Sequence, residues 1–206
     1  MSILISIVAI VVAYLFGAIP VGFLVAKAYG VDITASGSGR TGGTNVLRVA
    51  GPIAAGLTVM GDIFKGLIPV YFIESVFPAW VVAIAMVAAV LGHNYSIFLK
   101  FKGGVGAGTA VGAMGGAFFW AGFISGIAGL IALVVSRYAS LLSTAVAVTG
   151  VLTFTLFAIL GYTPYIYILG AVLTLLLMFY ALRPNFARIK AGTERKVGKT
   201  TEGPTV

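Results

Sequence analysis

GGVGAGTAVGAMGGAFFWAGFISGIAGLIALVVS, residues 103–136, is the stretch that decides the fold. None of its 34 residues is charged. One helix of that length would extend about 51 Å, whereas the hydrocarbon core of a bilayer is about 30 Å thick. The segment must therefore fold back on itself once, and the break is expected near Gly115-Gly116.

Three further uncharged stretches lie outward from this one. They cover residues 1–26, 75–99 and 138–182. Each reaches the length of about 20 residues that a membrane-spanning helix needs, and the last is long enough for two crossings, with Gly161 to Pro164 as the break. A further span, residues 49–73, is interrupted by Asp62 and Lys65. The sequence predicts an all-α polytopic membrane protein with seven transmembrane helices, two of them short.

The composition agrees with a bilayer protein. Of the 206 residues 60% are hydrophobic and only 9% charged, with a mean hydropathy of +1.12, which excludes an ordinary soluble domain. The absence of cysteine excludes a disulfide framework, a thiolate nucleophile and a cysteine-bound metal. The first stretch lacks the basic leader of a cleavable signal, so we expect a permanent span. Residues 1–206 are expected to form one integral membrane domain, with 198–206 as a disordered cytoplasmic tail.

The basic residues predict the orientation. Thirteen Lys and Arg against five Asp and Glu give a formal net charge of +8. Except for Lys65, the basic residues fall on one side of the predicted spans, whereas the opposite turns contain only Glu74. An excess of Lys and Arg marks the cytoplasmic side. We therefore expect the N-terminus outside, the C-terminus in the cytoplasm, an inner-membrane location, and no nucleic-acid partner.

The first cytoplasmic loop, GVDITASGSGRTGGTNVLR from Gly30 to Arg48, is rich in glycine. One interpretation is a flexible linker. The other is an anion cradle, in which glycine lets backbone N–H groups approach a phosphate and the guanidinium of Arg48 adds a bidentate contact. The loop lacks the GxxxxGK[ST] spacing of a Walker loop, so by itself it indicates phosphate binding only weakly.

A second polar cluster, GHNYSIFLKFKGGVGAGTAVG, extends from Gly92 to Gly112. Lys102 and the glycines after it precede a predicted helix start, whose partial positive charge favours a phosphate. Alternatively, the lysines fix the topology and the glycines permit close helix packing. His93 lies at the inner membrane boundary, where it is either a structural hydrogen-bonding group or a base.

Asp62 and Lys65 lie three residues apart within the second span. Ionisable side chains at such depth are costly unless they are paired, and this spacing places both on one helical face. We expect a structural ion pair.

Five motifs in order resemble one family. They are GSGRTGGTNVLR (37–48), DIFKG (62–66), GHNYSIFLKFKGG (92–104), SRYASL (136–141) and AGTERKVG (191–198). Together they resemble the bacterial acyl-phosphate:glycerol-3-phosphate acyltransferases, the PlsY family. The resemblance implies a seven-span enzyme that forms lysophosphatidic acid and inorganic phosphate from acyl phosphate and glycerol 3-phosphate, without a metal or other cofactor, among membrane lipids.

The chain departs from the family pattern at two positions near the expected site. Arg40 replaces an asparagine, and Val105 replaces a lysine that would contact phosphate. We expect Arg40 to supply the charge that is missing at position 105.

The resemblance implies acyl transfer to the 1-hydroxyl of glycerol 3-phosphate. Acyl phosphate carries a good leaving group, so the site needs cations and N–H donors rather than a covalent nucleophile. The catalytic candidates are Ser38, Arg48, Asn185 and His93. The candidates for substrate and phosphate binding are Gly37, Gly39, Arg40, Thr44, Asn45, Lys102, Gly103 and Gly104. A phosphate oxygen or His93 would accept the hydroxyl proton.

Two other classes stay open. One is a transporter of small anions or lipid phosphates, and the other is a catalytically silent family member. The sequence also leaves open the acyl-chain preference, the choice between acyl phosphate and acyl-CoA, the order of binding and the oligomeric state, for which a monomer is the expectation.

Overall fold

The computed structural model describes residues 2–198, so the predicted tail lies, apart from Gly198, outside the described residues. Within them the chain forms eight α-helices and one short 3-10 helix. The elements are α1 (Ile3–Ala18), α2 (Val21–Ala28), α3 (Gly43–Glu74), α4 (Ala79–Asn94), η1 (Ile97–Leu99), α5 (Ala107–Ala117), α6 (Phe119–Ser136), α7 (Ala139–Ile159) and α8 (Ile166–Lys190).

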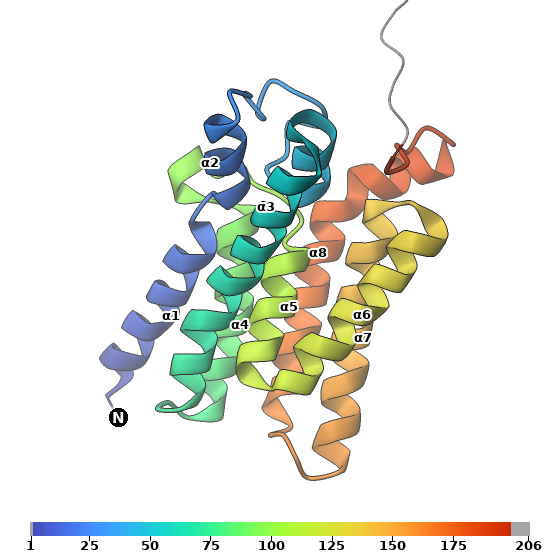
Figure 1. The fold of residues 1–206 in the computed structure, drawn as a ribbon. Helices are drawn as coiled ribbons and strands as arrows, with labels where there is room; N and C mark the ends of the chain where they lie inside the picture. The colour runs from blue at the N-terminus through green and yellow to red at the C-terminus, as the bar shows by residue number, and fades with distance from the viewer. Residues whose placement is uncertain (1, 199–206) are drawn as a thin grey trace, which may run out of the picture.

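The predicted all-helical membrane architecture is confirmed. Six helical segments are long and apolar enough to cross a bilayer: Ile3–Ala28, Gly43–Glu74, Ala79–Leu99, Phe119–Ser136, Ala139–Ile159 and Ile166–Lys190. The seventh predicted span corresponds to α5, whose 11 residues rise only about 16 Å. Figure 1 shows the helices as one bundle, with the N-terminus at one end and the last turn of α8 at the other.

The predicted fold-back occurs at Phe118, which has an extended backbone and lies two residues beyond Gly115-Gly116. The two glycines stay helical because they serve packing. A Cβ on Gly116 would lie 2.6 Å from the Leu67 carbonyl oxygen of α3, so only glycine permits this approach. The break between α7 and α8 falls at residues 160–165, where the glycine and proline predicted it.

The first predicted span corresponds to the segment Ile3–Ala28, which contains a local break, whereas the expected start of the second span is wrong. The uncharged stretch 1–26 is divided by Pro20 into α1 and α2. Helix α3 begins at Gly43, six residues before the predicted start, and kinks at Gly51, whose φ of 86° is one that glycine adopts readily. The last residues of the predicted loop, including Arg48, therefore lie on the first turns of α3.

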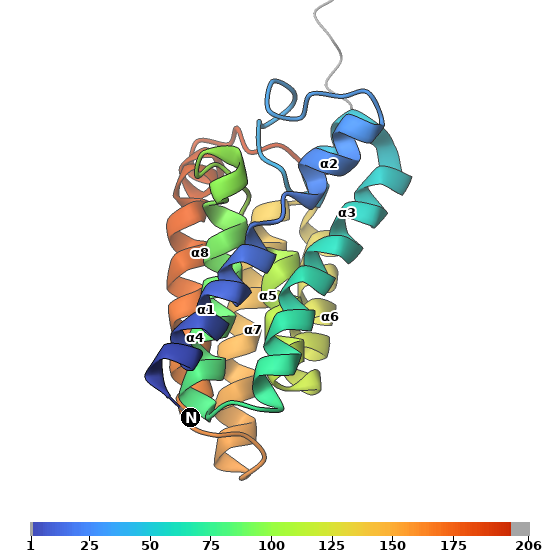
Figure 2. The same ribbon diagram turned by 90° about the vertical axis from the view of Figure 1, so that its left-hand side faces the viewer.

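The short helix α5 lies at the centre of the bundle, with α3 on one side and α6 and α7 on the other in Figure 1. In Figure 2 it again lies in the middle, with α8 on one side and α3 on the other. Its glycines allow the closest approach: a Cβ on Gly112 would collide with the backbone of α3 at Ile63. Helices α3 and α6 both pack on α5 but have little direct contact with each other within the described bundle. This leaves room above α5 between α3, α6 and α7.

Candidate active site

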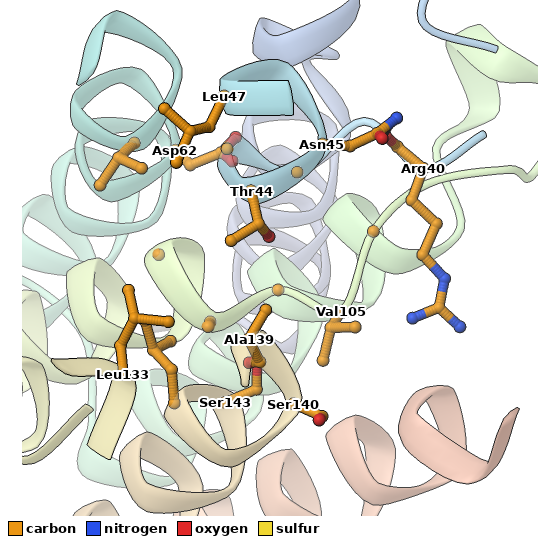
Figure 3. Close-up of a pocket in the computed structure, with 18 of the residues that line it drawn as sticks. Arg40, Thr44, Asn45, Leu47, Asp62, Val105, Leu133, Ala139, Ser140 and Ser143 are labelled. Carbon is orange, nitrogen blue, oxygen red and sulfur yellow. Dashed lines mark hydrogen bonds between the residues drawn. The ribbon is translucent and has the colours of Figure 1, made fainter. Parts of the chain in front are cut away.

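A cavity of about 830 Å³ occupies that room and extends to α8 and the first loop. One half of it is polar. This half is lined by Ser38, Arg40, Thr44, Asn45, Arg48, His93, Ser140, Ser143, Asn185, Arg188, Glu194 and Arg195. The other half is apolar, and Figure 3 shows Leu133 there, across the hollow from Thr44. A cavity of this kind suits a ligand with a charged head and an apolar tail.

Asn45, on the first turn of α3, shapes the glycine loop around Ser38. Its Oδ1 accepts a hydrogen bond from the Ser38 backbone N–H at 2.9 Å, and its Nδ2 donates to the carbonyl oxygens of Ser36 at 3.1 Å and Arg40 at 2.9 Å. Gly37 has a φ of +63°, and a Cβ there would collide with Asn45 Oδ1. The loop is thus a defined structure that presents Ser38 to the cavity.

The guanidinium of Arg40 connects this loop to α8. Its Nη1 donates to Asn185 Oδ1 and its Nη2 to the Ala181 carbonyl oxygen, both at 2.9 Å. Figure 3 shows the side chain extended toward α8. Burial and the nearby Arg188 lower the pKa of the Arg40 guanidinium from its ordinary value, whereas Glu194 raises it. Two segments 145 residues apart therefore meet at Asn185.

The C-terminal segment, residues 191–198, folds back over the polar half of the cavity. The side chain of Glu194 is only 6% exposed. Its carboxylate accepts hydrogen bonds from Asn185 Nδ2 at 2.7 Å, Arg188 Nε at 2.7 Å and Ser140 Oγ at 3.3 Å. The chain thus places one of its own anions among the cationic groups of the cavity.

Arginines 48 and 195 join the C-terminal segment to the first loop. Arg195 Nη1 donates to the Gly37 carbonyl oxygen at 3.0 Å, and Arg48 Nη2 lies 3.4 Å from the Arg195 carbonyl oxygen. The link through Arg48 is long, so its guanidinium keeps donors for a ligand. Arg48 comes from α3, close to the kink at Gly51.

Below the polar half lies a buried ionic cluster formed by Asp62, Lys65, His93 and Thr109. Asp62 Oδ1 is 2.8 Å from Lys65 Nζ and 3.5 Å from His93 Nδ1. The same His93 nitrogen is 3.1 Å from Thr109 Oγ1. Lys65 also donates to the carbonyl oxygen of Ile19, at the break between α1 and α2, at 2.8 Å. Asp62 and Lys65 therefore form the ion pair that their spacing indicates.

The start of α5 also faces the cavity. Gly104 to Gly108 contribute to the lining, and the N-cap residue Gly106 has no side-chain capping bond. Helix starts carry free N–H donors and a partial positive charge. Nearby, neither polar atom of the buried Asn94 amide has a partner among the described residues. This end of α5 is suited to an anion.

Some candidates from the sequence lie outside the cavity lining. Lys102 is exposed, and Gly39 and Gly103 also do not line the hollow. Gly103 instead packs so closely on the carbonyl of His93 that a Cβ would collide with it. The ammonium group expected to join Arg48 at the site is therefore displaced from it, and the cations that line the cavity within the described residues are all arginines.

Sequence reasoning missed five polar residues that the tertiary structure brings to the cavity: Ser140, Ser143, Arg188, Glu194 and Arg195. Glu194 carried a weak signal, since it is the acidic residue in the otherwise basic segment AGTERKVG. Ser140 lies in the motif SRYASL, but it was not singled out, because a serine at the start of an apolar span usually bonds to its own helix.

Comparison with known proteins agrees with this geometry. Residues 7–192 match the family model described as glycerol-3-phosphate acyltransferase. The glycerol-3-phosphate acyltransferase of Endomicrobium trichonymphae is 41% identical over 94% of this chain and 96% of its own length. A glycerol-3-phosphate acyltransferase of Thermus thermophilus is 39% identical, again over 94% of this chain and 96% of its own length.

Two solved structures have the same fold. Both are of PlsY (YgiH), described as an integral membrane glycerol 3-phosphate acyltransferase, and both are 32% identical to this chain. The glycerol 3-phosphate form superposes with a TM-score of 0.85 over 94% of this chain and 96% of that one. For the lysophosphatidic acid form the TM-score is 0.83, over 93% and 94%. This chain belongs to the glycerol-3-phosphate acyltransferase family, the PlsY family.

Proposed function

We propose that this protein transfers a fatty acyl group from acyl phosphate to the 1-hydroxyl of glycerol 3-phosphate, giving lysophosphatidic acid and inorganic phosphate for phospholipid synthesis. The observation that carries this proposal is that one cavity is lined both by four arginines and by many apolar side chains. Both an acyl phosphate and the product have a charged head joined to a hydrocarbon tail. The solved relatives are described in glycerol 3-phosphate and lysophosphatidic acid forms, which supports the same ligands here.

Two separate groups of donors are available for two phosphates. The first consists of Ser38, Arg48 and the backbone of the glycine loop, and the second is the uncapped start of α5. We assign one substrate phosphate to each, because two anions in one cavity need distinct donors. Arg40 and Asn185 connect the two sides and hold the loop against α8.

The reaction needs positioning and charge stabilisation. The 1-hydroxyl oxygen attacks the acyl carbonyl carbon, a new ester C–O bond forms, and the bond from the carbonyl carbon to the phosphate oxygen breaks. Inorganic phosphate leaves with that electron pair. Donors fixed in advance, such as Arg48 and Ser38, stabilise the negative charge that develops on the oxygens.

We assign the hydroxyl proton to an oxygen of the departing phosphate, since His93 is engaged with Asp62 and Thr109 in the buried ionic cluster. If His93 is not the proton acceptor, His93→Gln should keep more than about a tenth of the wild-type kcat. Loss of a general base would typically lower kcat at least a hundredfold. A loss of a hundredfold or more in a folded His93→Gln protein would assign the proton to the histidine.

The orientation proposed from the sequence places the polar half of the cavity at the cytoplasmic face of the inner membrane. Figure 1 supports this, because α2, the turn from α6 to α7 and the end of α8 gather at one end of the bundle. These segments carry Lys27, Arg137, Arg188 and Lys190, whereas Glu74 ends α3 at the other end. An excess of basic residues marks the cytoplasmic side.

The test is an assay of purified protein with labelled glycerol 3-phosphate and either palmitoyl phosphate or palmitoyl-CoA. Labelled lysophosphatidic acid from palmitoyl phosphate is the expected result, and the Arg48→Ala protein is the matched control. Product from palmitoyl-CoA alone would correct the donor. Product from neither donor would overturn the proposal in favour of transport or of a silent family member.

A further inference from the structure

The apolar half of the cavity has the same depth on three helices. Beyond the kink at Gly51, its lining extends from Ala55 to Ile63 on α3, and it extends from Leu133 to Gly126 on α6 and from Ala139 to Val146 on α7. Asp62, Ser140 and Ser143 are the polar residues within these otherwise apolar runs. At 1.5 Å per residue each of these runs covers about 10–12 Å. Since three helices give the same depth, the hollow ends at a common level, which we call the cavity floor and define as Ile63, Val111, Gly126 and Val146.

The floor lies where the α5–α6 hairpin closes. A Cβ on Gly122, one turn nearer the hairpin turn, would lie 2.5 Å from Gly115 Cα, so the two backbones touch there. A Cβ on Gly126 would lie 3.4 Å from Val111 Cγ1, which is ordinary van der Waals contact. The missing side chain of Gly126 therefore leaves usable space, whereas one turn further along α6, at Gly122, the contact between the two backbones leaves none.

We propose that the cavity floor sets the acyl-chain preference of this protein and that Gly126 is the determining residue. This inference rests on the proposed function. A C–C bond of about 1.5 Å advances an extended chain by roughly 1.3 Å, so the apolar half holds about eight or nine carbons. Longer chains leave sideways between α3 and α6, where the lining residue Leu130 is 59% exposed.

The test compares acyl phosphates of six and twelve carbons. The chain of hexanoyl phosphate ends above the cavity floor, so it fits with or without a side chain at position 126. The twelve-carbon chain uses the full depth of the apolar half of the cavity. In Gly126→Leu we expect the ratio of kcat/KM for twelve over six carbons to fall about 15-fold, which corresponds to two buried methylenes at about 0.8 kcal/mol each. In Val111→Ala, which deepens the floor, the same ratio should rise about fourfold.

Ile127→Phe is the matched control. Ile127 neighbours Gly126 on α6 but is 44% exposed and does not line the cavity. Its ratio should equal that of the wild type. An unchanged ratio in both Gly126→Leu and Val111→Ala would overturn the proposal, and Val111→Ala alone decides it should the leucine variant fail to fold.

A binding measurement separates this inference from the proposed function. Hexyl and dodecyl phosphate are titrated into the same proteins, with thermal stabilisation as the readout. If the wild type transfers acyl groups from neither donor, the proposed function fails, yet the affinity ratio of the two alkyl phosphates still tests the floor. If the affinity ratio of dodecyl over hexyl phosphate is about 15-fold lower in Gly126→Leu than in the wild type, the proposed role of the cavity floor is supported. Equal ratios in the two proteins refute it.

Discussion

Two groups of charged side chains in this protein look alike in chemistry but differ in how they are built. The buried ionic cluster is formed by residues within transmembrane helices, and its Asp62 and Lys65 side chains are only 5–6% exposed. The second group, which we call the rim cluster, consists of Arg40, Arg48, Asn185, Arg188, Glu194 and Arg195.

The rim cluster joins a loop, a kinked helix start and the C-terminal segment at the mouth of the cavity. Its bonds connect segments that lie far apart in sequence, and Arg188 in it is 42% exposed. Charges that stay near water can exchange a protein partner for a ligand, whereas a charge deep in the bundle cannot lose its partner cheaply. From this difference we expect the buried ionic cluster to serve mainly stability and the rim cluster to serve substrate binding.

Asp62→Ala tests this contrast with the largest expected effect on stability. Removing the aspartate leaves the ammonium of Lys65 buried without its carboxylate, which should cost about 3–5 kcal/mol of stability. Thermal unfolding of the purified protein measures the loss. The double variant Asp62→Ala, Lys65→Met should recover much of it because it buries no charge, and Glu74→Ala, an exposed acid, serves as control. A stable Asp62→Ala protein would show that the ion pair is dispensable.

Arg48→Ala should give the largest effect on activity. Loss of a fixed donor to developing charge should cost about 2–4 kcal/mol of transition-state stabilisation, roughly 30- to 1000-fold in kcat/KM. The melting temperature should change little, because the one hydrogen bond from Arg48 to the C-terminal segment is long, at 3.4 Å. Near-normal turnover in the folded variant would remove Arg48 from the mechanism.

Arg40→Ala should have a smaller effect, mainly on the Michaelis constant for a phosphate substrate. The lost charged hydrogen bond to Asn185 is worth about 1.5–3 kcal/mol, or roughly 10- to 100-fold. A double-mutant cycle with Asn185→Ala measures the coupling between the two residues. Additive effects of the two substitutions would contradict the bridge, and an unchanged Michaelis constant would remove Arg40 from binding.

Lys102→Ala should have the smallest effect of the series. The side chain is exposed and lies outside the cavity lining, so both kcat/KM and stability should stay within about 0.5 kcal/mol of wild type. Steady-state kinetics beside Arg48→Ala provides the comparison. A loss comparable to that of Arg48→Ala would place Lys102 among the substrate ligands.

Patterns within a few turns of chain were readable from the sequence. Uncharged stretches longer than a bilayer crossing required several helices and a fold-back, and the three-residue spacing of Asp62 and Lys65 indicated their pairing. The motifs also led to the family, which the comparisons confirm. Packing decided the finer geometry: Gly115-Gly116 stayed helical against α3 and α6, and the break fell two residues further on, at Phe118.

The site residues likewise fall into those that the sequence predicted and those that it did not. The motifs supplied Ser38, Arg48, His93 and Asn185 as candidates, and these residues line one cavity. Lys102 was grouped with them because it lies beside glycines in a motif, but its position in the chain carries no information on which way the side chain faces after the turn at η1. Glu194 was missed because its partners lie on α7 and α8.

Hydropathy, charge spacing and local motifs determined that this chain is a helical membrane protein of the glycerol-3-phosphate acyltransferase family, with glycine-rich and basic motifs near one face. These properties depend on the bilayer thickness and on residues a few positions apart, so the order of the amino acids is sufficient. Only the tertiary structure decided that a carboxylate from the C-terminal segment joins the arginines, and that Gly126 lines the same cavity as they do. Those features depend on distances between helices, which close packing of side chains from the whole bundle sets.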